Sequence, residues 1–84
     1  MATRTWEINL EGKPHTIRIL HGTISGKQEL WVDDQLMVTK RSLINYGFYH
    51  VFSIGGHFCE VGITTNGLTF FDYYLLVDQQ LIEH

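Results

Sequence analysis

His57 and Cys59 are the residues whose types and spacing favour chemistry in this 84-residue chain. They stand two apart, so on a β-strand both side chains lie on one face. An imidazole and a thiolate placed in this way can share a zinc ion, or the imidazole can activate the thiol as a nucleophile. Zinc requires two further ligands, and His15, His21 and His50 do not fall into the paired short spacings typical of zinc sites.

A structural role for this pair is the favoured interpretation. Cys59 continues with Val61 and Ile63 as every second residue of an apolar run, which predicts a buried and inert thiol. His57 follows a turn, where its imidazole is expected to hydrogen-bond to the backbone. The sequence therefore predicts a protein that is not an enzyme, with no catalytic, cofactor-binding or metal-binding residue. A small-ligand or metal-binding sandwich using His57 and Cys59 is the alternative.

Two other stretches resemble chemical motifs less closely. Asp33 and Asp34 are paired carboxylates, but consecutive residues in a tight turn point apart, and Asp is common in turns for backbone reasons. The glycine-bracketed loop from Gly22 to Lys27 departs from a phosphate-binding loop because Gln28 follows the lysine and no helix is expected after it. Asp33 and Asp34 are therefore interpreted as turn residues, and Gly22–Lys27 as a loop that does not bind nucleotide.

Aromatic residues form the candidate interaction surface. Neighbouring aromatics on a strand face opposite ways, so one of each pair is expected on an outer face, where it marks a contact surface for a protein or a second copy of the chain. Covering the core and protecting sheet edges are the alternative roles. The candidate residues are Tyr49, Phe70, Phe71, Tyr73 and Tyr74.

The elements that position these residues are expected to be β-hairpins. Gly55 and Gly56 sit between alternating β-formers at the length of a two-residue primed turn, and Asn66-Gly67 is a further turn signal. Expected strands are residues 5–10, 15–21, 29–32 and 36–39, then a strand from 48 or 49 to 54, and 57–61, 68–77 and 81–82, with residues 40–47 as a loop.

Eight strands without a convincing helix predict an all-β fold, either an antiparallel β-sandwich or a small barrel. A β-sandwich of two four-stranded sheets built from four hairpins is the preferred form. A single domain is expected over residues 1–84. The hairpin turns centre near Gly12, Asp34, Gly56 and Gln79, which are almost evenly spaced. This regularity indicates either an internal repeat or the spacing that eight short strands require.

Composition narrows the function. One cysteine permits no intrachain disulfide, which suits a reducing compartment, and the N-terminus lacks the apolar core of a signal peptide. No apolar run reaches the length of a membrane-spanning helix. Net charge is −3 with six scattered Lys and Arg, so no basic stripe is available for a phosphate backbone. A cytoplasmic protein that binds neither membrane nor nucleic acid is expected.

Three motifs resemble the Fas apoptosis inhibitory molecule family. They are His21–Lys27 followed by Trp31-Val32-Asp33, then Phe52–Cys59, then Leu75–Asp78. The resemblance extends from about Trp6 to Ile82, enough for one such domain. It implies a non-enzymatic sandwich of eight strands, and animal members are linked to restraint of death-receptor apoptosis and to protection against protein aggregation. The expected function is therefore protein interaction, with a second copy of the chain among the candidate partners.

Overall fold

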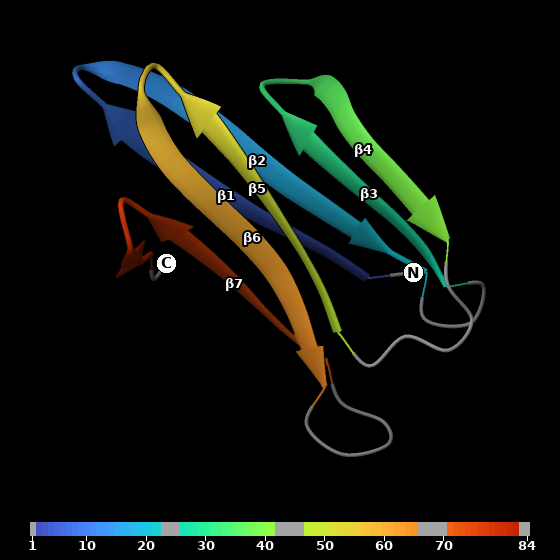
Figure 1. The fold of residues 1–84 in the computed structure, drawn as a ribbon. Coiled ribbons are helices and arrows are strands. Elements are labelled where there is room, and N and C mark those ends of the chain that lie inside the picture. The colour runs from blue at the N-terminus through green and yellow to red at the C-terminus, as the bar shows by residue number, and fades with distance from the viewer. Residues whose placement is uncertain (1, 23–25, 42–46, 66–70, 83–84) are drawn as a thin grey trace. The chain divides into compact units, whose positions relative to one another are not determined.

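The computed structural model describes residues 2–22, 26–41, 47–65 and 71–82 (Figure 1). They belong to two compact units, an N-terminal unit (Met1–Asn45) and a C-terminal unit (Tyr46–His84). The predicted Asn66-Gly67 turn, Phe70, the centre of the glycine-bracketed loop and most of the predicted 40–47 loop lie outside the described residues.

The N-terminal unit contains one antiparallel sheet with the strand order β1-β2-β3-β4. Alternating apolar and polar residues give these strands one face for burial and one for solvent. A register shift between Leu30 and Trp31 interrupts the pairing of the last two strands. The strands are β1 (Ala2–Leu10), β2 (Lys13–His21), β3 (Lys27–Val32) and β4 (Gln35–Arg41).

The C-terminal unit contains a second antiparallel sheet with the order β5-β6-β7-β8. Its strands are β5 (Gly47–Ile54), β6 (His57–Thr65), β7 (Phe71–Val77) and β8 (Gln80–Leu81). The predicted all-β fold, with eight strands in two four-stranded antiparallel sheets, is therefore confirmed. Within the described ranges there is no helix, and neither sheet closes into a barrel.

The predicted loop over residues 40–47 is too long at both ends. Lys40 and Arg41 continue β4, and Gly47 begins β5. The reason is that the partner strands are longer than the apolar patterns indicated. Arg41 pairs with Lys27 on β3, and Gly47 pairs with Thr64 on β6, so the backbone ladders extend past the last apolar residue.

The four two-residue hairpin turns in the described part of the chain each contain two residues with positive φ, the conformation of a primed turn whose twist suits the flanking strands. Glycine adopts it readily, but Glu11 and Gln79 do so against the usual preference of residues that carry a Cβ. The four pairs are Glu11-Gly12, Asp33-Asp34, Gly55-Gly56 and Asp78-Gln79.

One face of each sheet carries the buried apolar side chains. In the N-terminal unit, Trp6 pairs with Ile17 across β1 and β2. In the C-terminal unit, Cys59 pairs with Val77, and Val61 pairs with Leu75. Cross-strand partners share a face, so these pairings align the buried residues into continuous rows. The buried apolar residues are Trp6, Ile17, Ile19, Leu30, Cys59, Val61, Ile63, Leu75 and Val77.

Candidate functional site

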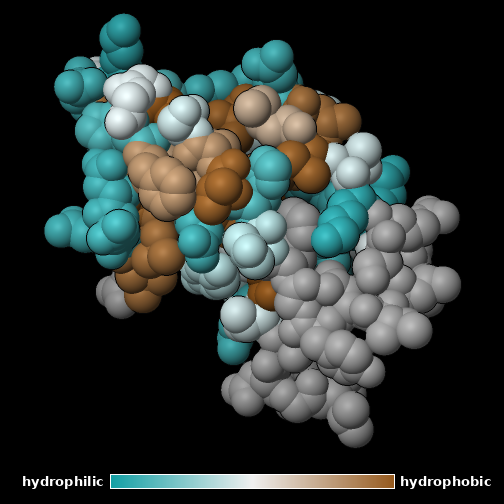
Figure 2. All heavy atoms as spheres, in the orientation of Figure 1, coloured by the Kyte–Doolittle hydropathy of each residue, from teal (hydrophilic) through white to brown (hydrophobic). Residues whose placement is uncertain are grey.

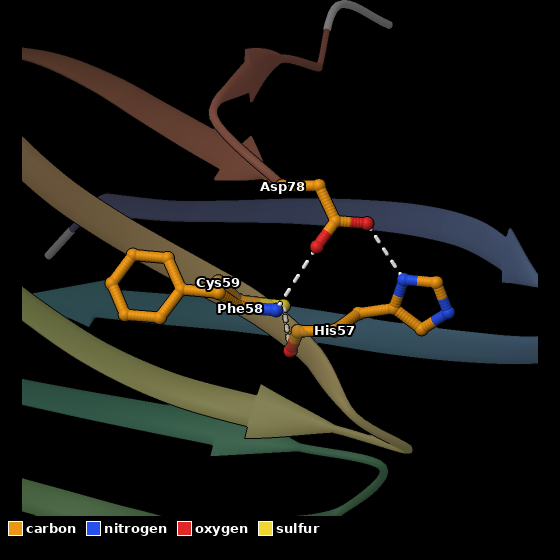
Figure 3. A network of polar contacts seen from close by, with 4 residues as sticks. All are labelled: His57, Phe58, Cys59 and Asp78. Atoms are coloured by element: carbon orange, nitrogen blue, oxygen red, sulfur yellow. Dashed lines mark hydrogen bonds and ion pairs between the residues drawn. The ribbon is translucent and has the colours of Figure 1, made fainter.

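His57 lies at the start of β6, directly after the Gly55-Gly56 turn. Its Nδ1 atom is 2.7 Å from Oδ2 of Asp78, which occupies the β7–β8 turn (Figure 3). The two are close because β6 and β7 pair in a register that sets Cys59 opposite Val77, one residue before Asp78. The His57 imidazole thus has a carboxylate partner, whereas the sequence predicted a hydrogen bond from this imidazole to the backbone.

Asp78 also fixes the backbone at the start of β6. Its Oδ1 accepts a hydrogen bond from the Phe58 N–H at 3.1 Å, and its own N–H donates to the Phe58 carbonyl oxygen at 2.7 Å. The hydrogen bond to His57, followed by that from the Phe58 N–H, lowers the pKa of the Asp78 carboxyl although desolvation acts against it. We refer to His57, Phe58 and Asp78 as the C-terminal clamp.

The N-terminal unit contains the same arrangement, which we call the N-terminal clamp. His15 Nδ1 lies 2.7 Å from Asp33 Oδ2, and the Thr16 N–H donates to Asp33 Oδ1 at 2.8 Å. The Asp33 N–H in turn donates to the Thr16 carbonyl oxygen at 2.8 Å. Both clamps join the second strand of a unit to its last turn. This shared geometry, together with the shared strand order, favours an internal repeat over a coincidence of spacing.

Cys59 is fully buried on the inward face of β6, as predicted. Its Sγ atom lies 3.6 Å from the carbonyl oxygen of His57. Burial, followed by the negative charge of Asp78, raises the pKa of the Cys59 thiol. A nucleophilic cysteine needs a lowered pKa and access to solvent, and this thiol has neither. Nor do the described residues contain a group of three or more His, Cys, Asp and Glu side chains able to hold a metal ion.

The outward face of the C-terminal sheet presents the other set of candidate residues. Tyr49, Gly62 and Tyr74 lie opposite one another on β5, β6 and β7, and Val51, Glu60 and Leu76 form the next row. Phe58 and Leu81 continue this side of the sheet on β6 and β8. The resulting surface, called here the aromatic face, comprises Tyr49, Val51, Phe58, Glu60, Tyr74, Leu76 and Leu81.

The apolar members of the aromatic face reach solvent. Tyr49 is 70% exposed, Leu81 57%, Phe58 49% and Val51 44%. Figure 2 shows apolar side chains at the surface among hydrophilic ones. Apolar residues scattered singly over a surface are ordinary, whereas neighbours gathered on one sheet face are typical of a contact site.

Glu60 occupies the middle of the aromatic face and is held by Tyr74. Gly62 has no side chain, and the Tyr74 ring occupies the space that a Cβ would need. From there the Tyr74 hydroxyl donates a 2.7 Å hydrogen bond to Glu60 Oε2. Burial, then this hydrogen bond and the charge of Glu60, raise the pKa of Tyr74 to about 12. The ring and the carboxylate are therefore fixed in one arrangement.

The structure brings together only part of the predicted surface. Tyr49 and Tyr74 share the aromatic face, whereas Tyr73 pairs with Ile63 on the opposite face, where burial raises the pKa of its hydroxyl. Phe71 belongs to β7, but its side chain, like the whole of Phe70, is outside the described part of the chain.

Sequence reasoning did not identify Val51, Phe58, Glu60 and Leu81 as surface neighbours. The Gly55-Gly56 turn could have identified the neighbours on β5 and β6, because a two-residue turn sets the register of its strands. That register places Ser53 opposite Phe58, and every second residue from this pair onward lies on the same face of the sheet.

The described residues thus define an all-β protein of eight strands in two open antiparallel sheets, with a buried thiol and an exposed aromatic face. The chain belongs to the family described as Fas apoptotic inhibitory molecule (FAIM1), whose sequence profile matches residues 2–84. No curated protein matches the chain. Within the described residues, no helix has the length and apolar character needed to cross a membrane.

Proposed function

We propose that this chain is a non-enzymatic protein-interaction domain that binds its partner through the aromatic face. The observation that carries the proposal is the gathering of exposed Tyr49, Val51, Phe58 and Leu81 on one side of one sheet. Membership of the Fas apoptotic inhibitory molecule family suggests that this interaction belongs to an apoptosis-related role.

The chemistry of the aromatic face supports a protein partner. Tyrosine and phenylalanine supply large contact areas with few rotatable bonds, and they are enriched at protein interfaces. Tyr74 orients the Glu60 carboxylate, which retains oxygens that can accept further hydrogen bonds. The partner that fits is an apolar segment carrying a hydrogen-bond donor or a positive charge.

Partly unfolded proteins expose segments of this chemistry. The resemblance to family members linked to protection against aggregation leads us to propose such proteins as the partner class, and the cytoplasm as the compartment. A lone reduced cysteine suits that compartment.

The absence of catalysis is also part of the proposal. Support comes from Cys59, whose burial and raised pKa disfavour the thiolate. Further support comes from His57 and His15, each of which is engaged by an aspartate that also fixes a turn.

The test is the suppression of aggregation of heat-denatured citrate synthase, followed by light scattering. We expect the wild-type chain to reduce scattering, and the double variant Tyr49→Ser/Phe58→Ser to lose most of this effect because it loses two anchors of the aromatic face. The matched control is Leu36→Ser/Met37→Ser on β4, which removes apolar side chains of 44% and 47% exposure in the other unit.

Equal protection by both double variants would contradict the assignment to the aromatic face. A wild-type chain that leaves scattering unchanged at several-fold molar excess would remove the proposed partner class. Circular dichroism of each variant separates lost binding from lost folding.

A further inference from the structure

The open edge of β5 differs from the other sheet edges in the described structure. An edge strand exposes unpaired backbone N–H and C=O groups, and proteins protect such edges with charges, proline, bulges or short length. The edge strand β1 carries Arg4 and Glu7, and β4 carries Lys40 besides a register shift. On the other side of the C-terminal sheet, β8 has two residues and pairs with Leu76 and Val77 only, and the rest of that edge, formed by β7, carries Asp72.

The strand β5 has none of these protections. Its sequence, Gly-Phe-Tyr-His-Val-Phe-Ser-Ile, contains no Lys, Arg, Asp, Glu or Pro, and its pairing with β6 runs without a shift over all eight residues. Among the described strands β5 pairs with β6 alone. Uncharged segments rich in aromatic and β-branched residues readily form further strand pairs. We therefore expect another β-strand to pair with this edge.

The backbone groups available at this edge follow from the hairpin register. A two-residue primed turn makes its flanking residues, Ile54 and His57, a hydrogen-bonded pair. Alternation along β5 then directs the N–H and C=O groups of Tyr49, Val51 and Ser53 to the open edge. The bond from the Asp78 N–H to the Phe58 carbonyl agrees, since it shows that Phe58 bonds toward β7 and that its neighbours on β6 bond toward β5.

We propose that β5 of a second copy of this chain occupies the edge, in an antiparallel pair whose two-fold axis passes Val51. In this register Val51 faces the partner copy's equivalent residue, and Tyr49 faces Ser53 of the other copy. Each of these pairs exchanges two hydrogen bonds, so about six bonds join the copies. The sheet becomes continuous from one copy into the other.

Two features favour a second copy as the occupant. A two-fold pair is closed at this edge, because the β5 edge of each copy is used once and cannot pair with a third chain. The pairing also meets no charge repulsion, since β5 carries no formally charged side chain. This inference does not depend on the proposed function.

The pairing also extends the aromatic face. Tyr49 and Val51 belong to that face and also to the edge strand, so the two copies bring their exposed apolar side chains together across the two-fold axis. One surface then extends over the C-terminal sheets of both copies. A bivalent surface gains binding strength for a partner long enough to contact both halves.

Sedimentation velocity across a concentration series tests the proposal with the full chain. We expect a reversible dimer for the wild type, and for Val51→Lys a dissociation constant at least about tenfold higher, because two ammonium groups then face each other at the axis. Val51→Pro is the second variant. It removes an N–H that points away from β6 and so leaves the β5–β6 ladder intact. The control Met37→Lys, on the edge strand β4 with 47% exposure, should dimerise as the wild type does.

A cross-link locates the axis. Equivalent Cα atoms of a hydrogen-bonded pair lie about 5.5 Å apart, within disulfide range, so Val51→Cys should form a covalent dimer on mild oxidation while Met37→Cys should not. A wild-type chain that stays monomeric at every concentration would overturn the proposal. So would a dimer that persists in a folded Val51→Lys or Val51→Pro chain, or one that is lost in Met37→Lys.

Discussion

Replacement of Gly62 by alanine should destabilise the protein only while Tyr74 is present. A methyl group at this position would overlap the outer ring atoms of Tyr74, namely Cε1, Cζ and the hydroxyl oxygen. Ordinary contact distances require the ring to move by about 1 Å or more. That movement breaks the 2.7 Å hydrogen bond to Glu60.

The size of the effect can be worked out from these contacts. A hydrogen bond to a charged group contributes about 1.5–3 kcal/mol, and solvent on the aromatic face reduces this to about 1 kcal/mol. A ring held off its preferred rotamer costs about 0.5–1.5 kcal/mol more. Alanine regains about 0.5–1 kcal/mol over glycine within a strand. Gly62→Ala should therefore lower the free energy of unfolding by about 1 kcal/mol.

A double-mutant cycle isolates the contact between Gly62 and Tyr74. Without the ring, in a Tyr74→Ala background, the same Gly62→Ala substitution should raise the free energy of unfolding by about 0.5–1 kcal/mol, so its sign reverses. Urea unfolding followed by the fluorescence of Trp6 and Trp31 measures each variant. An equal loss of stability in both backgrounds would refute the reasoning, because the cost would then arise from the backbone and not from the ring.

Four further outcomes follow from the described contacts. Because folding raises the pKa of Tyr74, its protonated hydroxyl stabilises the folded state below pH 10, the ordinary tyrosine value, and this stabilisation should be lost as pH rises toward about 12. Tyr74→Phe should remove this pH dependence of the free energy of unfolding, measured by urea unfolding. Because folding lowers the pKa values of Asp33 and Asp78, their carboxylates stabilise the fold above about pH 4, and the free energy of unfolding should fall as pH drops below 3.8. Asparagine at both positions should reduce this fall in stability at low pH. Cys59 should react with a thiol reagent only as fast as the chain unfolds, and immediate labelling of the native chain would contradict its burial. Leu30→Ala, at a fully buried position, should cost about 2–5 kcal/mol by calorimetry or urea unfolding.

The strands could be predicted because two local signals agree. Alternation identified the buried rows that contain Trp6, Ile17 and Cys59, and the Gly55-Gly56 pair marked its turn. Strand ends were less predictable. Arg41 belongs to β4 because its backbone pairs with β3. Pairing of this kind does not depend on side-chain polarity, so the apolar pattern could not predict where the strand ends.

The clamps were not predictable because they join residues far apart in the chain. His57 and Asp78 are brought together by the pairing of β6 with β7, and the local sequence around each residue does not indicate the other as its partner. The segments Trp31–Leu36 and Leu76–Leu81 have similar sequences, and the turns they contain are part of the regular spacing noted above. The meaning of this similarity becomes clear only when Asp33 and Asp78 are seen to make the same contacts.

The C-terminal unit combines the C-terminal clamp with the open edge of β5. The clamp fixes the last turn to the start of β6 through His57 and Asp78, so one side of the sheet is secured within the chain. The edge at β5 has no comparable fastening among the described residues. Because β5 carries both Tyr49 and the unpaired backbone groups, its occupant would fix the aromatic face as well. Binding and self-association should therefore be coupled, and Val51→Lys should weaken protection against aggregation as well as dimerisation.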